Sequence, residues 1–170
     1  MNNTIPQSLT LAQCFERALI AEHFLRDLYL ALAQKFAAFP QLVDFWEDMA
    51  GDEVIHAQRL VAQRDALSAE QLQRPADMPA TLEEMLRTCH FSVEEAVADI
   101  HDFHAAYNLT VELENSEIND VFIFLTTQFL ADNDAVKALI VSKLQDHVNK
   151  VMSLSERFGG IEGRRLIKSQ

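Results

Sequence analysis

Four segments of this chain carry a glutamate or histidine where helical spacing would otherwise place an apolar residue. In the first segment, seven of eight residues spaced three or four apart are apolar or aromatic, and the eighth is Glu22. The second segment has Glu53 and His56 in such a row, the third has Glu114, and the fourth has His147. Because residues three and four apart share one face of a helix, these side chains are predicted to point inward.

Carboxylates and imidazoles that converge in a core favour a metal site. A buried ionised carboxylate costs several kcal/mol unless it is paired, and no inward lysine or arginine is evident in these rows. Two divalent cations would neutralise four carboxylates, and Fe(II), Mn(II) and Zn(II) all accept such ligands. The candidate metal ligands are Glu22, Glu53, His56, Glu114, Glu117 and His147.

Some of these residues also have a structural interpretation that involves no metal. Glu117, one turn after Glu114 and at the edge of its row, could be a solvated acid. His147 alone could be a core histidine that is satisfied by hydrogen bonds. His104 lies about 15 Å along a helix before Glu114, too far to share one cluster, and is predicted to be a core histidine. Tyr29, two turns after Glu22, could hydrogen-bond near the cluster.

The elements that position these residues are predicted to be long helices. Glycine and proline number four each among 170 residues, and neither occurs between Pro79 and Gly159. This composition argues against a β-rich fold and excludes a glycine-rich phosphate loop. We predict one all-α domain over residues 1–170, whose segments are helices at 8–39, 41–65, 92–130 and 132–158, a crossover at 66–91 and a flexible tail at 159–170 that contains an Ile-Glu-Gly-Arg string.

Local signals support these boundaries. Thr10 with Gln13, and Ser92 with Glu95, have the spacing of capping boxes. Gly51 costs the second helix about 1 kcal/mol of helix propensity and could mark close packing against a neighbour. Short connections make antiparallel pairs of the first two helices and of the last two. With one long crossover between helices 2 and 3, the expected architecture is a ferritin-like antiparallel four-helix bundle.

The charge balance narrows the possible partners. Twenty-six acidic residues against fourteen basic ones give a net charge of −12, which argues against nucleic acid and anionic membranes and suits cations. No apolar run is long enough to span a membrane, and no signal peptide is apparent. Cys14 and Cys89 are far apart, so neither a thiolate metal site nor a disulfide framework is expected, and the cytoplasm is the default location.

The two halves of the chain echo each other. Glu22 precedes His56 by 34 residues, and Glu114 precedes His147 by 33. Each predicted helix pair therefore supplies an inward glutamate on its first helix and an inward histidine on its second. This pseudo-twofold pattern is the one that a two-metal site between two helical hairpins requires.

Residues 10 to 157 resemble the rubrerythrin-type diiron domain of the ferritin-like superfamily. The strongest pieces are Glu22 with Tyr29 seven residues later, and the stretch Met-Ala-Gly-Asp-Glu-Val-Ile-His that ends at His56. The resemblance implies that the six candidate ligands bind iron, with Glu114 and Glu117 forming the E-x-x-E variant. The chain departs from the family's ligand pattern at one position, where Leu144 replaces a bridging glutamate. The chain also has no cysteine-ligated rubredoxin domain.

The resemblance implies a non-haem diiron protein with two irons per chain, in which Zn or Mn are possible occupants. It would be an oxidoreductase that reduces peroxide or oxidises ferrous iron, with dioxygen or peroxide as the small oxidant and an external electron donor. The alternative is a decayed site, a metal-binding or interaction module without turnover, as Leu144 suggests. A metal-free structural bundle is a third reading. A homodimer is possible, since Phe122, Phe124 and Phe129 crowd more than one face.

Overall fold

A computed structural model describes residues 8–129 and 134–158 of the chain. The side chains of Glu117 and of residues 155–158 lie outside this description, as do the whole predicted tail at 159–170 and the start of the helix predicted at 132. Every regular element in the described residues is a helix, which confirms the all-α prediction. None of the helices in the described ranges is long and apolar enough to cross a membrane.

The first two long helices form an antiparallel pair. Helix α1 (Leu11–Lys35) begins with the predicted capping box, in which the Thr10 side chain accepts from the Gln13 backbone and the Gln13 side chain accepts from the Thr10 backbone. It ends before the predicted residue 39, because a turn of three residues precedes α2 (Pro40–Asp65). Proline at the first position of α2 lacks the N–H that a preceding helical turn would require.

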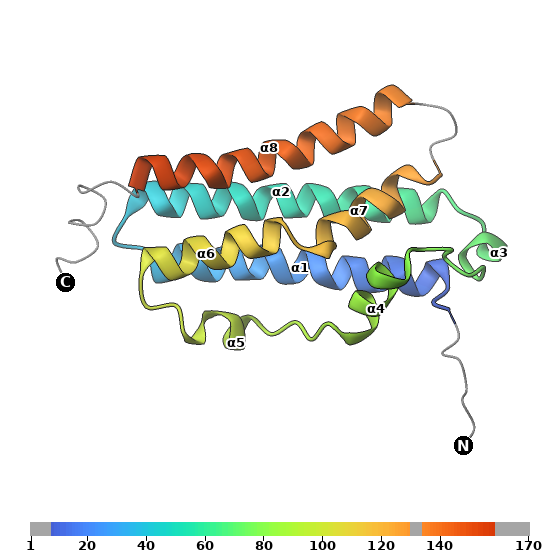
Figure 1. The fold of residues 1–170 in the computed structure, drawn as a ribbon, viewed down its shortest axis with the longest axis horizontal. Coiled ribbons are helices and arrows are strands. Elements are labelled where there is room, and N and C mark those ends of the chain that lie inside the picture. The colour runs from blue at the N-terminus through green and yellow to red at the C-terminus, as the bar shows by residue number, and fades with distance from the viewer. Residues whose placement is uncertain (1–7, 130–133, 159–170) are drawn as a thin grey trace, which may run out of the picture.

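A long connection follows α2 and contains three short helices, α3 (Ala69–Leu72), α4 (Ala80–Thr88) and α5 (Val93–Ala98). Figure 1 shows this connection running back along the molecule from the end of α2 to the start of α6. Leu82 and Leu86 of α4 are buried against the core. The connection therefore reverses the chain, so that the next long segment runs in the same direction as α2.

The prediction of one continuous helix over residues 92–130 is wrong. The segment is divided into α5, α6 (Phe103–Glu114) and α7 (Glu117–Thr127). Asp102 caps α6 by accepting from the Ala105 backbone. The Ser116 hydroxyl accepts from the Ile118 backbone and donates to the Leu113 carbonyl. Short polar side chains interrupt the helix here without glycine or proline, because they offer the backbone competing hydrogen bonds.

The residues of α6 that face the core also differ from the prediction. His104, predicted to be a core histidine, is exposed, and Phe103 and Ala106 are buried in its place. Phe122 is fully buried, and Phe124 and Phe129 pack partly buried against a core cluster. None of the three phenylalanines is therefore fully available as a partner surface.

The last long helix, α8 (Asp134–Phe158), packs on α6 and α7. The core around these helices has two apolar clusters. One contains Tyr29 and Trp46, and the other contains Phe15, Phe122 and Leu144. Along α1, α2 and α8 the predicted ligands fall between the residues of the two clusters, so the polar side chains form a layer across the middle of the core.

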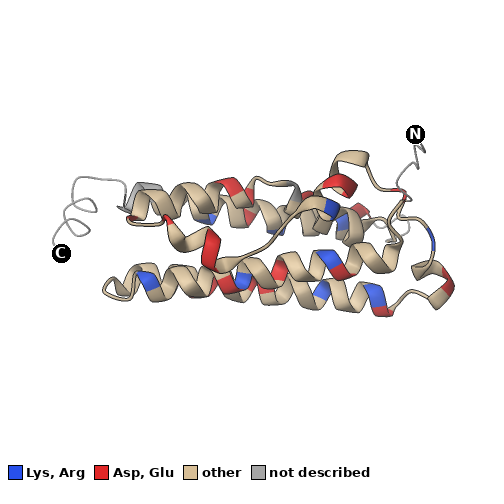
Figure 2. Ribbon diagram, turned by 90° about the horizontal axis from the view of Figure 1, so that it is seen from below, with Lys and Arg blue, Asp and Glu red and all other residues tan. Residues whose placement is uncertain are grey.

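Acidic and basic residues are dispersed along the helices, as Figure 2 shows. Gly51 of α2 is exposed, and a Cβ atom built there would meet nothing within 4 Å. The prediction that Gly51 marks close packing is therefore wrong, and the residue acts only through its low helix propensity.

Candidate metal centre

The structure brings five of the six predicted ligands together in the polar layer of the core. All five side chains are nearly inaccessible to solvent, with residue exposures of at most 5 %: Glu22, Glu53, His56, Glu114 and His147. The sixth, Glu117, begins α7 directly after the helix break, but its side chain lies outside the described part of the structure. Buried Glu and His groups that could hold a metal ion are therefore present.

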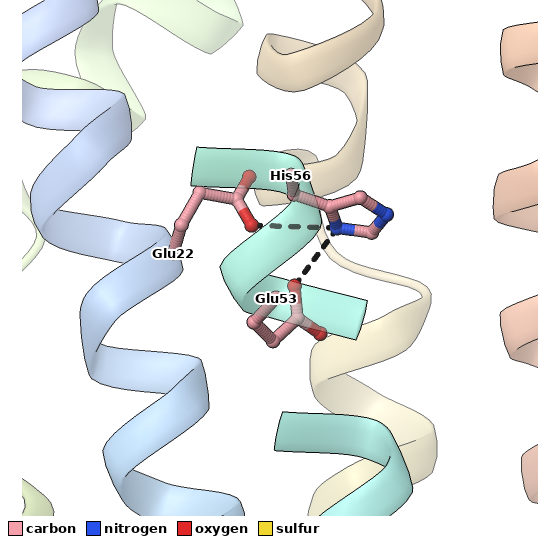
Figure 3. A group of neighbouring side chains, drawn as sticks. All are labelled: Glu22, Glu53 and His56. Atoms are coloured by element: carbon pink, nitrogen blue, oxygen red, sulfur yellow. Dashed lines mark hydrogen bonds and ion pairs between the residues drawn. The ribbon is translucent and has the colours of Figure 1, made fainter. Parts of the chain in front are cut away.

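The first group consists of Glu22 from α1 and Glu53 and His56 from adjacent turns of α2. Nδ1 of His56 lies 2.9 Å from Oε2 of Glu53 and 3.4 Å from Oε2 of Glu22. Figure 3 shows both carboxylates turned toward this nitrogen. One ligand atom from each residue lies within 4.8 Å of the others, so a single cation could contact all three. We call this group the His56 triad.

The second group consists of Glu53 again, Glu114 from the end of α6 and His147 from α8. Nδ1 of His147 lies 3.4 Å from Oε2 of Glu114 and 3.7 Å from Oε1 of Glu53. These ligand atoms also lie within 4.8 Å of one another. We call this group the His147 triad.

Glu53 belongs to both triads and directs one oxygen to each. Its Oε2 faces His56 and its Oε1 faces His147, and the two imidazole ring centres are 5.0 Å apart. In both triads the histidine uses Nδ1 toward Glu53 and toward one glutamate of another helix. The pseudo-twofold pattern of the sequence thus appears in space, with the Glu53 carboxylate between its halves.

Two polar side chains hold Glu114 in place. The Tyr29 hydroxyl donates to Oε1 of Glu114 over 2.5 Å, as its position two turns after Glu22 predicted. The Asn119 amide donates to the Glu114 carbonyl over 2.7 Å and lies 3.3 Å from Oε2. Asn119 could not be found from a continuous helix, because five residues correspond to a rotation of about 140° away from Glu114.

An aspartate and a lysine lie on the outer side of the His147 triad. Oδ2 of Asp52 is 2.8 Å from Nε2 of His147 and is also ion-paired with Nζ of Lys150. A carboxylate beside the outer nitrogen of a ligating histidine is a common feature of metal sites, where it orients the ring. Sequence reasoning missed Asp52, although its place one turn before His56 puts it at the flank of the inward row.

Protons stabilise this cluster when no metal is bound. Burial raises the pKa of Glu53 to about 8, and the negative charge of Glu22 adds to the rise. Burial alone would lower the pKa of His56, but Glu22 and Glu53 outweigh it and raise that pKa to about 10. Burial raises the pKa of the Tyr29 hydroxyl well above its ordinary value, and the Glu114 charge adds to this rise, so Tyr29 stays a donor.

In the His147 triad, the pKa of Glu114 shifts in the direction opposite to that of Glu53. Burial favours the neutral form of Glu114, but His147 and then Tyr29 outweigh it, and the pKa of Glu114 is lowered. Burial likewise opposes charging of His147, yet Glu114 and Glu53 raise its pKa. The metal-free cluster therefore carries protons at the positions that a cation would occupy, and metal binding would release them.

The donor atoms of the two triads face one another as charge pairs. Oε2 of Glu22 lies 3.4 Å from Nδ1 of His56, and the ring nitrogens of His147 lie 2.8 Å from Asp52 and 3.4 Å from Glu114, without a well-aligned hydrogen bond at any of these three atoms. Donor atoms grouped in this way could be shared by a metal ion. Three carboxylates and two imidazoles are a ligand set that Fe(II), Mn(II) or Zn(II) accepts.

Leu144 lies three residues before His147 and supplies no ligand. Its side chain is 5 % exposed and packs in the apolar cluster with Leu60, Phe122 and Leu125. The described part of the cluster therefore holds three buried glutamates.

The comparisons with known proteins add no relative from which a role could be carried over. No family model, no curated protein and no solved structure matches this chain. What the site can do must therefore be argued from its own geometry and chemistry.

Proposed function

We propose that this chain is a ferritin-like, rubrerythrin-like diiron protein that reduces peroxide with electrons from an external donor, or oxidises ferrous iron with peroxide or dioxygen as the oxidant. Two arguments support a ferritin-like arrangement. The long segments α1, α2, α6 with α7, and α8 run along the same axis, and a long connection joins the second to the third (Figure 1). The two triads lie where these segments meet, which is where such bundles bind metal pairs.

The Glu53 carboxylate is the observation that carries the proposal. Each of its oxygens faces Nδ1 of a different histidine, as a carboxylate shared by two cations would. A site for one cation would need only one triad. Two ions would also balance more of the buried negative charge of Glu22, Glu53 and Glu114 than one ion.

The side chains around the triads would keep the site ordered and dry. Two iron ions held by Glu22, Glu53, Glu114 and the two histidines would supply two electrons to peroxide or dioxygen. Tyr29 holds Oε1 of Glu114 and leaves Oε2 directed at His147. The Phe122 ring, 4.6 Å from the His56 ring centre, covers that imidazole. Apolar clusters on both sides exclude water, which strengthens the electrostatic interactions between ligands and cations.

Anaerobic titration of the metal-free protein with Fe(II) tests the proposal. We expect saturation near two irons per chain, followed by oxidation of both irons when peroxide is added. The absence of binding at micromolar iron would refute the proposal. Elemental composition of the protein purified from its own host would then identify the physiological metal.

Leu144 favours a second candidate, a metal-binding module without turnover. The leucine is well packed in an apolar cluster, so the last helix contributes a histidine without the bridging glutamate. One tightly held zinc or iron that is indifferent to peroxide would support this candidate. Glu117→Ala separates the two: the iron stoichiometry falls if Glu117 supplies the missing carboxylate, and it is unchanged if the site has decayed.

A further inference from the structure

A groove between α2 and α8 lies beside the His147 triad. Its volume is about 220 Å³, and it is lined by Gln41, Asp44, Phe45, Asp48, Lys150 and Ser153. Asp44, Asp48 and Asp52 follow one another at four-residue steps, so they lie along one face of α2. This row spans about 12 Å of helix, and its inner member, Asp52, contacts Nε2 of His147.

Lys150 separates the groove from the triad. The side chain lines the groove, and its ammonium is ion-paired with Oδ2 of Asp52. The Lys150 side chain is 41 % exposed and that of Asp52 is 29 % exposed. Because water reaches both groups, this pair opens far more easily than a buried ion pair would. Lys150 can therefore leave Asp52 without abandoning a charge in the core.

His147 provides an independent observation on the inner side of the groove. The residue is 3 % exposed, and both of its ring nitrogens face carboxylates without a well-aligned hydrogen bond to either. Its Nε2 is directed at Asp52 and its Nδ1 at Glu114. The His147 imidazole therefore connects Asp52, on the side of the groove, with Glu114 inside the triad.

Two other grooves beside α2 have a different character. One includes Arg59, Leu139 and Ile140 in its lining, and the other includes Arg26 and Val54. Neither lining contains a carboxylate, and an arginine repels cations. The groove at Lys150 is therefore the one of these three with carboxylates in its lining, and Lys150 connects it to the His147 triad through Asp52.

We propose that this groove is the access route for divalent cations to the metal centre and that Lys150 is its gate. The inference rests on the proposed function and names how the site is loaded. Asp44 and Asp48 attract the cation, which displaces the Lys150 ammonium from Asp52. Asp52 and His147 would hold the cation next, and Glu53 and Glu114, which face His147 from the inner side, would take it up from there. Six waters of hydration occupy about 180 Å³, which the groove can hold.

Uptake of Co²⁺ by the metal-free full chain tests the route, with stopped-flow absorbance for the rate and calorimetry for affinity and stoichiometry. In Asp44→Asn/Asp48→Asn we expect uptake at low ionic strength to be about tenfold slower, within the range of electrostatic steering. The affinity at equilibrium and the stoichiometry should stay unchanged, and added salt should shrink the difference. The matched control, Glu47→Gln/Glu112→Gln, removes the same charge from exposed positions outside the groove.

Lys150→Ala tests the gate. We expect uptake several-fold faster than in the wild type with the same final stoichiometry, whereas Lys150→Arg should keep the wild-type rate. If Lys150→Ala does not fold, Lys150→Met keeps most of the side-chain stem and answers the same question. A lower affinity without faster uptake would make Lys150 a structural residue and overturn the gate.

The outcomes separate this inference from the function on which it rests. Equal slowing in the groove variant and its control would mean that only net charge matters, and it would overturn the route. If the wild type binds two Co²⁺ and the groove variant loads at the wild-type rate, the route is wrong and the metal centre stands. If the wild type binds no Co²⁺, the proposed metal centre itself fails.

Discussion

The His56 triad and the His147 triad share Glu53 but have different surroundings. On the first side, the Phe122 ring covers His56, and Oε2 of Glu22 lies buried 3.4 Å from Nδ1 of His56. On the second side, Tyr29 and Asn119 hold Glu114, and Asp52 leads from His147 toward the solvent. One half is closed by aromatic packing, and the other is ordered by polar contacts that extend outward.

This difference indicates that the surrounding side chains can give two similar sets of ligands different metal-binding properties. A closed triad favours a cation that is held tightly, because water and competing ligands are excluded. A triad with polar neighbours and a route outward favours a cation that exchanges or reacts. We therefore expect substitutions around the His147 triad to alter metal uptake and reactivity there without changing metal binding by the His56 triad. Only substitution of Glu53 should affect both triads.

The largest expected effect comes from Glu53→Gln, because Glu53 belongs to both triads. The amide cannot supply charged oxygen ligands to two cations, so the affinity for both ions should fall by more than about 100-fold, the upper end of what outer-sphere changes cost. Calorimetric titration with Fe(II) or Co²⁺ measures this loss, with Glu47→Gln as a control on the exposed side of α2. Retention of one ion at wild-type affinity would show that Glu53 is not shared.

The next effect concerns pH. The metal-free protein should lose stability against unfolding as the pH rises, and bound metal should counteract this loss. The folded pKa values of Glu53 and His56 are raised to about 8 and about 10. A group with a raised folded pKa contributes stability below its unfolded pKa and loses it as the pH rises through the folded value. The metal-free protein should therefore lose on the order of a few kcal/mol between about pH 5 and pH 10.

Denaturant unfolding at several pH values measures this loss, and the metal-loaded protein provides the contrast. Because cations displace the protons from Glu53 and His56, the stabilisation by metal should grow as the pH rises. Metal-free stability that is constant across this range would mean that the two residues do not share protons in the folded state.

A smaller effect, confined to the second side, is expected from Tyr29→Phe. The variant loses the donor that holds Oε1 of Glu114, and loss of such an outer partner costs about 10–100-fold in metal affinity. The weaker of two binding steps should change and the other should not. Tyr107→Phe is the matched control, since its hydroxyl contacts only the Met152 sulfur at the surface. Equal weakening of both steps would make the two halves a single cooperative unit.

The sequence predicted the two-sided cluster better than it predicted the helices that carry it. Rows of apolar residues interrupted by Glu22, Glu53 and His147 are visible because burial of a charge is costly and therefore conspicuous. The breaks at Asp102 and Ser116 were not predicted, because capping by short polar side chains depends on which backbone groups the fold leaves unpaired. The contact of Asn119 with Glu114 spans the break at Ser116 and depends on it.

The row in the third segment shows a different limit. The spacing placed His104 and Glu114 in one inward row, whereas the buried row of α6 is Phe103, Ala106, Thr110 and Glu114. His104 lies one residue from this buried row, a rotation of about 100° around the helix. Two rows that begin one residue apart can thus both end at Glu114, and spacing alone does not distinguish them.

The smallest expected effect concerns the helix that supplies ligands to both triads. Gly51 lies two residues before Glu53, and a Cβ atom there meets nothing within 4 Å. Gly51→Ala should therefore stabilise the metal-free protein by about 0.5–1 kcal/mol, or roughly 2–4 °C in Tm at the upper value. Thermal unfolding measures this gain.

Metal titration of Gly51→Ala then shows whether α2 must flex for Glu53 to reach both sides. If the helix is already in its binding geometry, both affinities stay at the wild-type value while stability rises, and the contrast between the triads lies in their neighbours alone. If the affinity of one step falls as the helix stiffens, then Glu53 reaches that triad only by a local motion of α2. The difference between the two sides would then belong partly to the backbone that they share.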